Sequence, residues 1–491
     1  MKAARLVAVA LSLSMIFSAC VSMHRNVPDT AFVEPAACPP QQSLVGQGKP
    51  NSGTEVLTLE QCIEIARANN PGLAAGAWDV QTALAQRDNA ASERWPNFRG
   101  VGSYTSYVQN QRLVPVRKNN DPGMFSSSIV AGDIILRMPL FTGGRIRSEI
   151  SAADLLSQAA TQRLARTWEE LIFNVSSTFY TILGQQPVIE SLQFSIKALN
   201  KQLQRAVDMM RVGKAAKVDV LRTEVRISDV EQRLVREQTV LDIQRRLLTT
   251  LMGIGDDRGP LKPQGELRAL RPVPDLNGAL AMAYAERGDY KAARSSVDSQ
   301  AMKLAAARAQ RWPRLSLEGS YGTRYAAGIT DNAAAFINRF VRTPAPLGQG
   351  KEFYSPGVSP SLPVGNIGVV ADYPIFDGGK ITSQVREQES RLASTQQNLR
   401  KLELQIRLDV ETGLLNVDSA RKRVLATRKA IEQAKESFRI ETEKYDLGKG
   451  SITDVLDAQA AMLDAQTNHY RALADYSIAL AQLGLATGEK R

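Results

Sequence analysis

Side chains that catalyse reactions or bind metals are rare in this chain and lie far apart. The 491 residues include two histidines, His24 and His469, and neither belongs to a cluster with the spacing of metal ligands. Two glycine pairs, which begin at Gly143 and Gly378, are too short for a phosphate-binding loop and are typical of a turn from a strand into a helix. The sequence therefore predicts no catalytic site, no metal and no cofactor, and we expect a protein that is not an enzyme.

The first cysteine indicates export and lipid attachment. Basic residues precede the apolar stretch 6–17, and the segment ends at Cys20 in the order Phe-Ser-Ala-Cys, which predicts a signal peptide over 1–19. This ending resembles a bacterial lipoprotein signal, in which the cysteine becomes the lipidated first residue. The alternative is an ordinary signal peptide with an incidental cysteine. Val21 follows, not the aspartate that favours inner-membrane retention in such lipoproteins, so the outer membrane is the expected destination.

Cys38 and Cys62 are the only cysteines of the predicted mature chain. They could pair as a disulfide in an oxidising periplasm, or remain two free thiols. Cys38 lies in the stretch 20–56, which is rich in Pro, Gly, Ser and Gln and is predicted to be an extended, lipidated tether. No later segment offers about 18 consecutive apolar residues, so no transmembrane helix is predicted.

The net charge does not indicate a nucleic-acid partner. The formal charge is +11, but Lys and Arg are interspersed with Glu and Gln along helical faces. Such a distribution is typical of solvated helix surfaces, so we expect no binding to nucleic acid.

A proline-free segment from Gly379 to Leu447 organises the second half of the chain. Apolar residues recur in it every seven positions, and the period resumes after a shift of four. The series is Val385, Leu392, Leu399 and Ile406, then Val410, Val417, Val424, Ile431, Phe438 and Tyr445. This period predicts a helix that supercoils with its neighbours. At ~1.5 Å per residue the helix would be roughly 100 Å long.

The same arrangement occurs twice. An offset of 217 superimposes Trp95-Pro96 on Trp312-Pro313, and an offset of 235 superimposes Phe141-Thr142-Gly143-Gly144 on Phe376-Asp377-Gly378-Gly379. The 235 offset also relates the two heptad series. The sequence therefore predicts a tandem repeat in which each copy contains a helix, a hairpin, a long helix and a returning helix. The expected organisation is the signal peptide 1–19, the tether 20–56, the first repeat 57–255, the linker 256–275 and the second repeat 276–491.

The hairpin of each repeat alternates apolar and polar residues. In 315–325 one face is apolar and aromatic while the other carries Glu318 and Arg324, and 367–375 alternates in the same way. Strands of about ten residues with one apolar and one polar face are typical of a membrane β-barrel. Two hairpins supply four strands, and an open sheet edge is not tolerated in lipid. Several chains are therefore expected to share one barrel.

These motifs, in this order and duplicated, resemble the TolC-like outer-membrane efflux protein family in its lipoprotein branch, the NodT type. The resemblance implies a mixed α/β membrane protein. It would be a homotrimer with a twelve-stranded transmembrane β-barrel, four strands from each chain, continuous with a long periplasmic α-helical coiled-coil barrel. It also implies an outer-membrane channel of a tripartite efflux system. Such a channel passively conducts substrates from an inner-membrane pump and a periplasmic adaptor to the exterior through a gated pore.

The resemblance places a periplasmic gate at the helix tips, with Tyr445, Asp454 and Asp457 as its residues. The tip turns would contain Gly213, Gly448 and Gly450, and the last of these occupies the position of a gate arginine found in some members.

The residues at the tip could also have purely structural roles. Tyr445 is the last residue of the heptad series, and Asp454 would be favourable near a helix N-terminus, as would its counterpart Asp219. The counterpart of Asp457 is Arg222, so the charge of Asp457 is not dictated by the repeated fold.

Two other functions fit the sequence. The first is the outer-membrane duct of a type I protein secretion system, and the second is a periplasmic coiled-coil adaptor without a pore. The amphipathic hairpins argue against the adaptor, and a neighbouring adaptor–pump operon would separate efflux from secretion. The exported substrate is not specified by the sequence.

Overall fold

We analysed a computed structural model of the chain. It describes residues 56–115, 125–213, 216–254, 262–267, 270, 272, 274–326 and 361–489. The predicted signal peptide 1–19, the lipidation site Cys20, Cys38 and nearly all of the tether 20–56 lie outside these residues. All the described residues belong to one compact unit.

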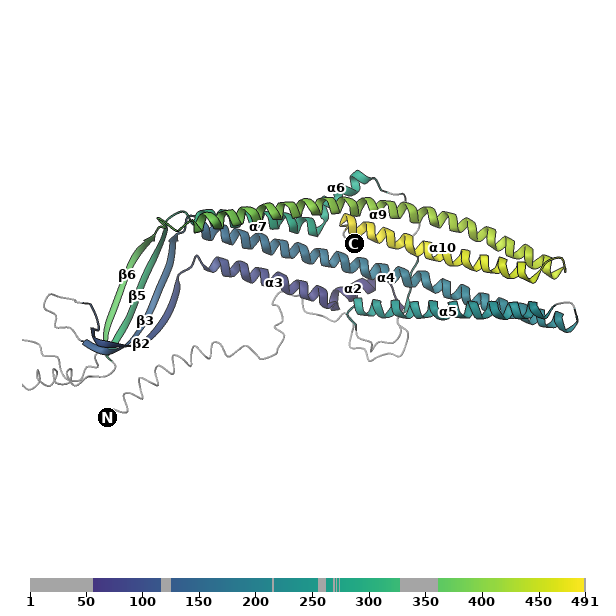
Figure 1. Cartoon of the computed structure of the whole chain (residues 1–491), viewed down its shortest axis with the longest axis horizontal. Helices are drawn as coiled ribbons and strands as arrows, with labels where there is room; N and C mark the ends of the chain where they lie inside the picture. Colours follow the sequence, from purple (N-terminus) through teal and green to yellow (C-terminus); the bar gives the residue numbers. More distant parts are fainter. Residues whose placement is uncertain are drawn as a thin grey trace, which may run out of the picture. The chain divides into compact units, whose positions relative to one another are not determined.

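The two halves of the chain contain the same elements in the same order (Figure 1). In the first half these are β1 (Val56–Leu57), α2 (Leu59–Asn69), α3 (Pro71–Ser92), β2 (Asn97–Arg112), β3 (Phe125–Phe141), α4 (Arg145–Arg211) and α5 (Lys217–Leu251). In the second half they are β4 (Lys262–Pro263), α6 (Leu276–Glu286), α7 (Gly288–Ala309), β5 (Arg314–Ala326), β6 (Ser361–Asp372), α9 (Lys380–Asp446) and α10 (Ile452–Thr487). Each half is thus two short helices, a hairpin, a long helix and a returning helix.

The long helices follow the predicted heptad pattern. The segment predicted as one helix is α9, and both α9 and α4 contain 67 residues. The heptad residues of α9 are most deeply buried at the centre of the helix, where Val410, Val417 and Val424 are almost inaccessible to solvent. Pro187 lies inside α4, which is helical on both sides of it. Among the described residues, no helix is long and apolar enough to cross a bilayer.

The hairpins form one antiparallel sheet with the strand order β2-β3-β5-β6, so β2 and β6 are its edges. One face carries ion pairs between neighbouring strands, namely Arg137–Glu318, Arg324–Asp133 and Arg314–Asp372. The opposite face carries exposed apolar side chains, which include Phe98, Tyr104, Ile134, Tyr321, Ile367 and Val369. This arrangement confirms the predicted alternation of an apolar and a polar face.

The helix before each hairpin is broken, and the sequence reading was wrong on this point. Each repeat was predicted to have a single helix before its hairpin. Instead Asn70 and Arg287 each have an extended backbone, with ψ of 120° and 125°. Pro71 disfavours a helical conformation at Asn70, and the Asn70 side chain then caps α3 by accepting a hydrogen bond from the Leu73 N–H at 3.1 Å.

The two breaks are equivalent, because Asn70 and Arg287 are related by the 217 offset. Each side chain donates a hydrogen bond to a carbonyl at the end of a returning helix: Asn70 to Leu251 at 2.8 Å and Arg287 to Ala486 at 3.2 Å. Those two carbonyls are related by the 235 offset. We call these two contacts the joints of the first and second repeats.

A glycine completes each joint. Gly253 and Gly488 have φ of +67° and +72°, and each lies against the helix break. A Cβ at Gly253 would lie 2.3 Å from the Asn69 carbonyl oxygen, and one at Gly488 would lie 2.9 Å from the Arg287 nitrogen. The end of the returning helix therefore packs directly on the backbone of the break.

The described residues of the predicted linker 256–275 include a short strand that pairs with the first repeat. This strand, β4, pairs in parallel with β1, which joins the start of the first repeat to the segment that leads into the second. A Cβ at Gly265 would lie 3.4 Å from the ring of Phe179 of α4. Next to this pairing lies an apolar cluster in which α2 packs on α4 and α5, with Cys62 and Ala66 fully buried.

Candidate functional site

The turns that end the two long helices lie at the same end of the helices (Figure 1). Gly213 and Gly448 have φ of +76° and +70°, as residues that reverse the chain after a helix commonly do. Gly450 is not in this region of φ, but a Cβ there would lie 3.1 Å from the Tyr445 nitrogen. The three glycines predicted for the tip turns thus occupy them, for two different reasons.

Asp454 and Asp219 act as helix caps. The Asp454 carboxylate accepts a hydrogen bond from the Ser451 N–H at 3.4 Å, and the Asp219 carboxylate accepts one from the Ala216 N–H at 3.3 Å. Both are third residues of returning helices, where a carboxylate is stabilised by unpaired N–H groups. The repeated fold therefore accounts for the acid at both positions.

Asp457 has no such role. It is exposed one turn further into α10, and it makes no hydrogen bond or ion pair within the part of the chain that the structure describes. Of the two acids assigned to the gate, Asp457 is the one whose charge is left uncompensated.

Tyr445 is half-buried at the end of α9, against an apolar cluster to which both halves contribute. That cluster contains Val188, Leu192, Leu199, Ile227, Val230, Ile452, Leu456 and Leu463. Burial raises the pKa of the Tyr445 hydroxyl, and the negative charges of Asp219 and Asp446 raise it further. The hydroxyl stays protonated at neutral pH, and Asp219 of the other repeat is near enough to act on it electrostatically.

Polar contacts fasten the returning helix of one half to that of the other. Going away from the tip, Arg222 of α5 donates to the Thr453 hydroxyl of α10 at 2.9 Å. Arg233 then pairs with Asp464 at 3.0 Å, and Glu237 with Arg471 at 2.6 Å. We call these three contacts the polar row. Sequence reasoning missed it, and its only signal was that Arg222 does not match its counterpart Asp457.

Both halves of the chain match the sequence profile of the family described as outer membrane efflux protein, over residues 62–254 and 279–489. The chain belongs to the outer membrane efflux protein family.

Relatives of this family match along most of their length. The chain is 23% identical to the outer membrane protein TolC of Vibrio cholerae, over 88% of this chain and 90% of that protein. It is 24% identical to the toluene efflux pump outer membrane protein TtgI of Pseudomonas putida, over 90% of each. The crystal structure of the outer membrane protein VceC from Vibrio cholerae has the same fold, with a TM-score of 0.71, 20% identity, and coverage of 88% of this chain and 96% of that one.

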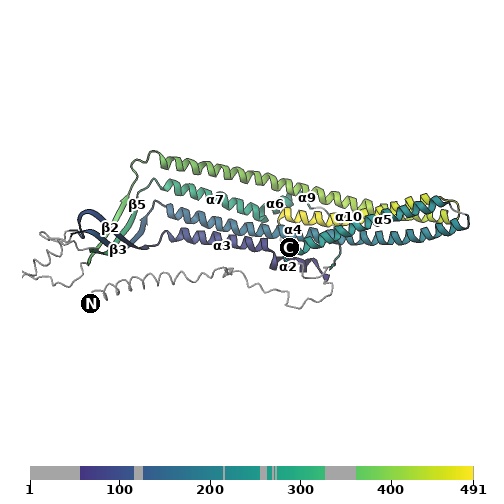
Figure 2. The same cartoon turned by 60° about the horizontal axis from the view of Figure 1, so that its bottom comes forward.

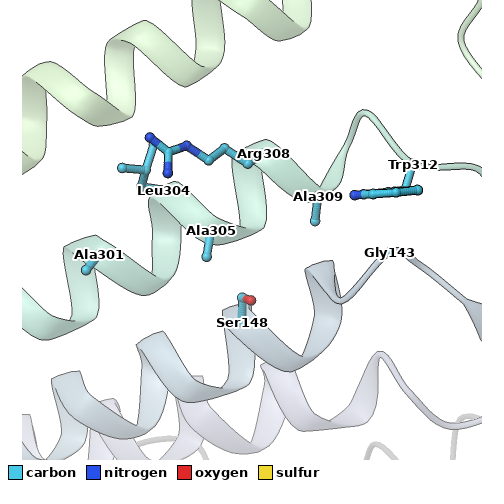
Figure 3. Close-up of a pocket in the computed structure, with 8 residues that line it drawn as sticks. All are labelled: Gly143, Ser148, Ala301, Leu304, Ala305, Arg308, Ala309 and Trp312. Atoms are coloured by element: carbon cyan, nitrogen blue, oxygen red, sulfur yellow. The ribbon is translucent and has the colours of Figure 1, made fainter.

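Two motifs of this efflux-protein chain meet at the other end of the helices, where they join the sheet (Figure 3). Trp312, exposed before β5, lies beside Gly143 at the start of α4, and Ser148 and Arg308 line the same hollow. A Cβ at Gly143 would lie 2.6 Å from the Trp312 Cβ. The first glycine pair therefore lets the tryptophan of the other repeat pack on the turn. Arg308 is held by Glu389 at 2.8 Å, so the hollow offers no unpaired charge.

The remaining predicted site concerns the cysteines. Cys62 is a buried residue of α2 that forms no disulfide with any described residue, and burial together with the charge of Glu60 raises the pKa of its thiol to about 12. Cys38 lies outside the described residues, so the pairing of the two stays a prediction. Among the described residues, no group of His, Cys, Asp and Glu side chains is arranged to hold a metal ion.

Proposed function

We propose that this chain is the outer-membrane channel of a tripartite efflux system and conducts substrates passively from a pump and its adaptor to the exterior. The observation that carries the proposal is the sheet, whose apolar face is exposed and whose opposite face is charged and ion-paired. An apolar face suits contact with lipid, and a charged face suits a water-filled lumen. The exposed apolar sheet argues against a periplasmic adaptor without a pore.

The channel is a homotrimer. The described sheet has two unpaired edges, β2 and β6, and unpaired backbone groups are costly in hydrocarbon. Three chains that join β6 of one to β2 of the next would close a twelve-stranded barrel without an edge. The long helices α4 and α9 would continue it as an α-helical barrel in the periplasm.

The gate lies at the helix tips. Tyr445, Asp454 and Asp457 are close to the turns, and the polar row holds the two returning helices together there. A Cβ at Gly450 would lie 3.1 Å from the Lys444 Cβ and from the Tyr445 nitrogen, so a larger residue there would require a small shift of the turn. Arg222 supplies a tie between the halves instead, from the first repeat to Thr453 of the second.

The C-terminal end of α9, next to the tip turn, offers a surface to the adaptor. A shallow groove near the tip is lined by Glu432, Glu436, Ile440, Glu441 and Lys444. Glu436 is paired with Arg439 and Glu441 with Lys444, so the groove combines an exposed apolar side chain with one further acid, Glu432. Such a surface suits a helical hairpin with apolar and basic residues. TtgI is, by its name, the outer membrane protein of an efflux pump. The energy for transport would come from the inner-membrane pump.

Lipid attachment at Cys20 would hold the chain in the outer membrane in addition to the barrel. The mass of the purified protein should correspond to loss of residues 1–19 and gain of acyl groups. An unmodified N-terminus at another residue would refute lipidation and leave the channel proposal intact.

The channel function is tested by conductance. Purified protein reconstituted in planar bilayers should give stable, discrete current steps, and deletion of the tip segment 440–458 should increase the current of each step. A preparation that inserts as an oligomer but never conducts would contradict the proposal. Export of a reporter dye from cells, dependent on a co-expressed pump and adaptor, separates efflux from secretion of a protein substrate.

A further inference from the structure

One level of the second helical hairpin is polar where the first hairpin is apolar. The hairpin of α9 and α10 packs on the hairpin of α4 and α5 (Figure 2). His469 of α10 lies next to Thr427 of α9, with 3.1 Å between the imidazole Nδ1 and the hydroxyl oxygen. The 235 offset relates these residues to Leu234 and Leu192, which belong to one apolar cluster of the first hairpin. A titratable side chain therefore takes the place of an apolar one.

The Thr427–His469 contact lies where the burial of α9 ends. Within the chain, the last buried residue of α9 is Val424, and the later heptad residues Ile431 and Phe438 are only half-buried. In α4, by contrast, burial continues to Ala206, near the end of the helix. Residues 427–446 of α9, which we call the distal segment, are thus held less firmly within the chain than the equivalent residues of α4.

The hydrogen bonds of Thr427 indicate which imidazole nitrogen takes a proton. The Thr427 hydroxyl donates to the Arg423 carbonyl at 2.8 Å, so its oxygen accepts from the Nδ1–H of His469. Nε2 is then the basic nitrogen, and it has no hydrogen-bond partner among the described residues. Protonation of Nε2 would add a positive charge to a half-buried contact that has no acid to balance it.

The surroundings of the imidazole disfavour that charge. Burial lowers the pKa of the His469 side chain, and the positive charge of Arg428 of α9 lowers it further. Helix α4 packs on the neighbouring residue of α10, Tyr470, through an apolar cluster. The ion pairs that join α10 to α9 and α5 around this level already satisfy their acids: Arg423 with Asp475, Arg471 with Glu237, and Arg233 with Asp464.

We propose that the Thr427–His469 contact is proton-sensitive: it holds the distal segment of α9 on α10 while the imidazole is neutral and releases it when the imidazole is protonated. A positive charge without a partner is costly in a half-buried site, whereas an imidazolium released into water is solvated. The tip turn follows the distal segment, so acid would favour movement of the tip. That consequence rests on the proposed gate, whereas the contact itself does not.

The direction of the pH effect follows from the two states of the contact. The released imidazole binds a proton more tightly than the packed one, because its pKa returns to the ordinary value of about 6.5. Falling pH therefore favours the released state, from about pH 6.5 downward until the packed imidazole is protonated as well. Above this range the imidazole is neutral in both states, and the contact keeps its full stability.

Amide hydrogen exchange of the full-length protein in detergent tests the contact. After correction for the intrinsic pH dependence of exchange, the protection of peptides from the distal segment should fall at least about threefold between about pH 7.5 and about pH 5.5. Peptides from residues 192–211, the equivalent part of α4, should show no such fall and are the internal control. An equal fall in both segments would indicate a general effect of acid and would contradict the proposal.

A matched set of variants separates His469 from other titrating groups. His469→Asn keeps a donor near the position of Nδ1 but does not titrate, so the fall in protection should disappear while protection at about pH 7.5 stays within about twofold of the parent. Thr427→Leu with His469→Leu restores the apolar pair of the first hairpin and should be better protected at both pH values.

His24→Asn removes the only other histidine of the chain and should leave the fall unchanged. Persistence of the fall in His469→Asn, or its loss in His24→Asn, would overturn the proposal. Because exchange reports on the hairpin and not on current, either result leaves the channel function to be decided by conductance.

Discussion

At the scale of single residues, Asp457 is the clearest candidate for a functional charge. Asp454 and Asp219 both cap helices, so their removal has a structural cost, whereas the Asp457 side chain is exposed and makes no hydrogen bond or ion pair within the described residues. Asp457→Ala should lower the cation-to-anion permeability ratio of the reconstituted channel by at least about twofold, because a ring of uncompensated carboxylates at a constriction attracts cations.

Asp219→Ala is the control for that change. It should lower thermal stability slightly, by about 1 kcal/mol for a lost cap, and leave selectivity within error of the parent. If Asp457→Ala leaves the reversal potential unchanged, the constriction lies elsewhere.

Near the second joint, the pKa values of two acids, Glu169 and Asp289, are shifted in opposite directions. Burial raises the pKa of Glu169, and the hydrogen bond and charge of Arg166 offset this only in part. Burial also raises the pKa of Asp289, but the hydrogen bonds and charge of Arg287 outweigh it, so the pKa is lowered overall.

An acid whose pKa is higher in the folded than in the unfolded protein destabilises the fold when it is ionised. An acid whose pKa is lower in the folded protein stabilises the fold when it is ionised. At pH 7 Glu169→Gln should therefore raise the melting temperature, and Asp289→Asn should lower it. The first difference should shrink as the pH falls toward the ordinary glutamate pKa of about 4.3, and the second should vanish only below the ordinary aspartate pKa of about 3.9. Melting curves between pH 4 and 8 test both, and a fall in melting temperature for Glu169→Gln would contradict the reading of the Glu169 site.

Thiol labelling of Cys62 tests whether it forms a disulfide with Cys38 of the predicted tether. Its thiol is buried, so it should not react with a maleimide in the folded protein. After denaturation without reductant, a disulfide with Cys38 leaves no thiol to label, whereas labelling at both positions refutes the pairing.

At the scale of the elements, the joints depend on glycine. Gly253→Ala should destabilise the protein by about 2–4 kcal/mol, because the new Cβ is strained by its positive φ and collides with the Asn69 carbonyl. Gly488→Ala should cost less, since its nearest atom is 2.9 Å away instead of 2.3 Å.

Gly213→Ala is the matched control for the joints. Gly213 has a similar φ of +76°, but no atom of the described residues would lie within 4 Å of the added Cβ, so only the backbone strain of about 1 kcal/mol remains. Thermal unfolding in detergent should rank the three variants in this order of loss: Gly253, Gly488, Gly213. A cost at Gly213 equal to that at Gly253 would show that contact with the helix break is unimportant.

The sheet makes its own prediction. Ile134→Arg places a charge on the apolar face and should reduce the amount of protein assembled in the outer membrane, since a charge facing lipid costs about 2–4 kcal/mol. Thr105→Arg adds the same side chain on the polar face and should assemble normally. Equal losses from both would contradict the assignment of the faces.

The sequence predicted the elements better than their interruptions. The heptads and the two offsets were sufficient to locate the long helices, the returning helices and the hairpins, because these depend on local period and on repetition. The break at Arg287 could not be read, since nothing around it resembles Asn70-Pro71. It depends on a buried guanidinium that donates to Ala486 and pairs with Asp289 and Asp409, and these groups are distant in sequence or hidden in a helical pattern.

At the helix tips, too, the sequence predicted local features but not contacts between residues distant in sequence. The turn glycines and the acids after them were visible from the repeat. The polar row was not, because Arg222 and Thr453 belong to different repeats and meet only when the two returning helices are packed. Pairing between positions 231 residues apart leaves no local signal in one sequence.

At the scale of the whole molecule, the described four-stranded sheet has two open edges, which would be costly in hydrocarbon without partner chains. If the proposed trimer is correct, native mass measurement in detergent should give three chains per particle. A stable monomer that conducts would overturn the assignment of these strands to a shared barrel.

The polar row also limits the symmetry of such an assembly. By the 235 offset, the counterparts of Arg222 and Thr453 are Asp457 and Val218, and those of Glu237 and Arg471 are Ala472 and Arg236. Neither of these counterpart pairs joins a donor to an acceptor. Only the counterparts of Arg233 and Asp464, which are Asn468 and Asp229, do so, and their contact would involve a neutral amide in place of a guanidinium. A ring of six similar hairpins would therefore alternate between three junctions with three polar contacts each and three junctions with one. A force applied evenly around its mouth would part the chains from one another before it parted the halves of any one chain.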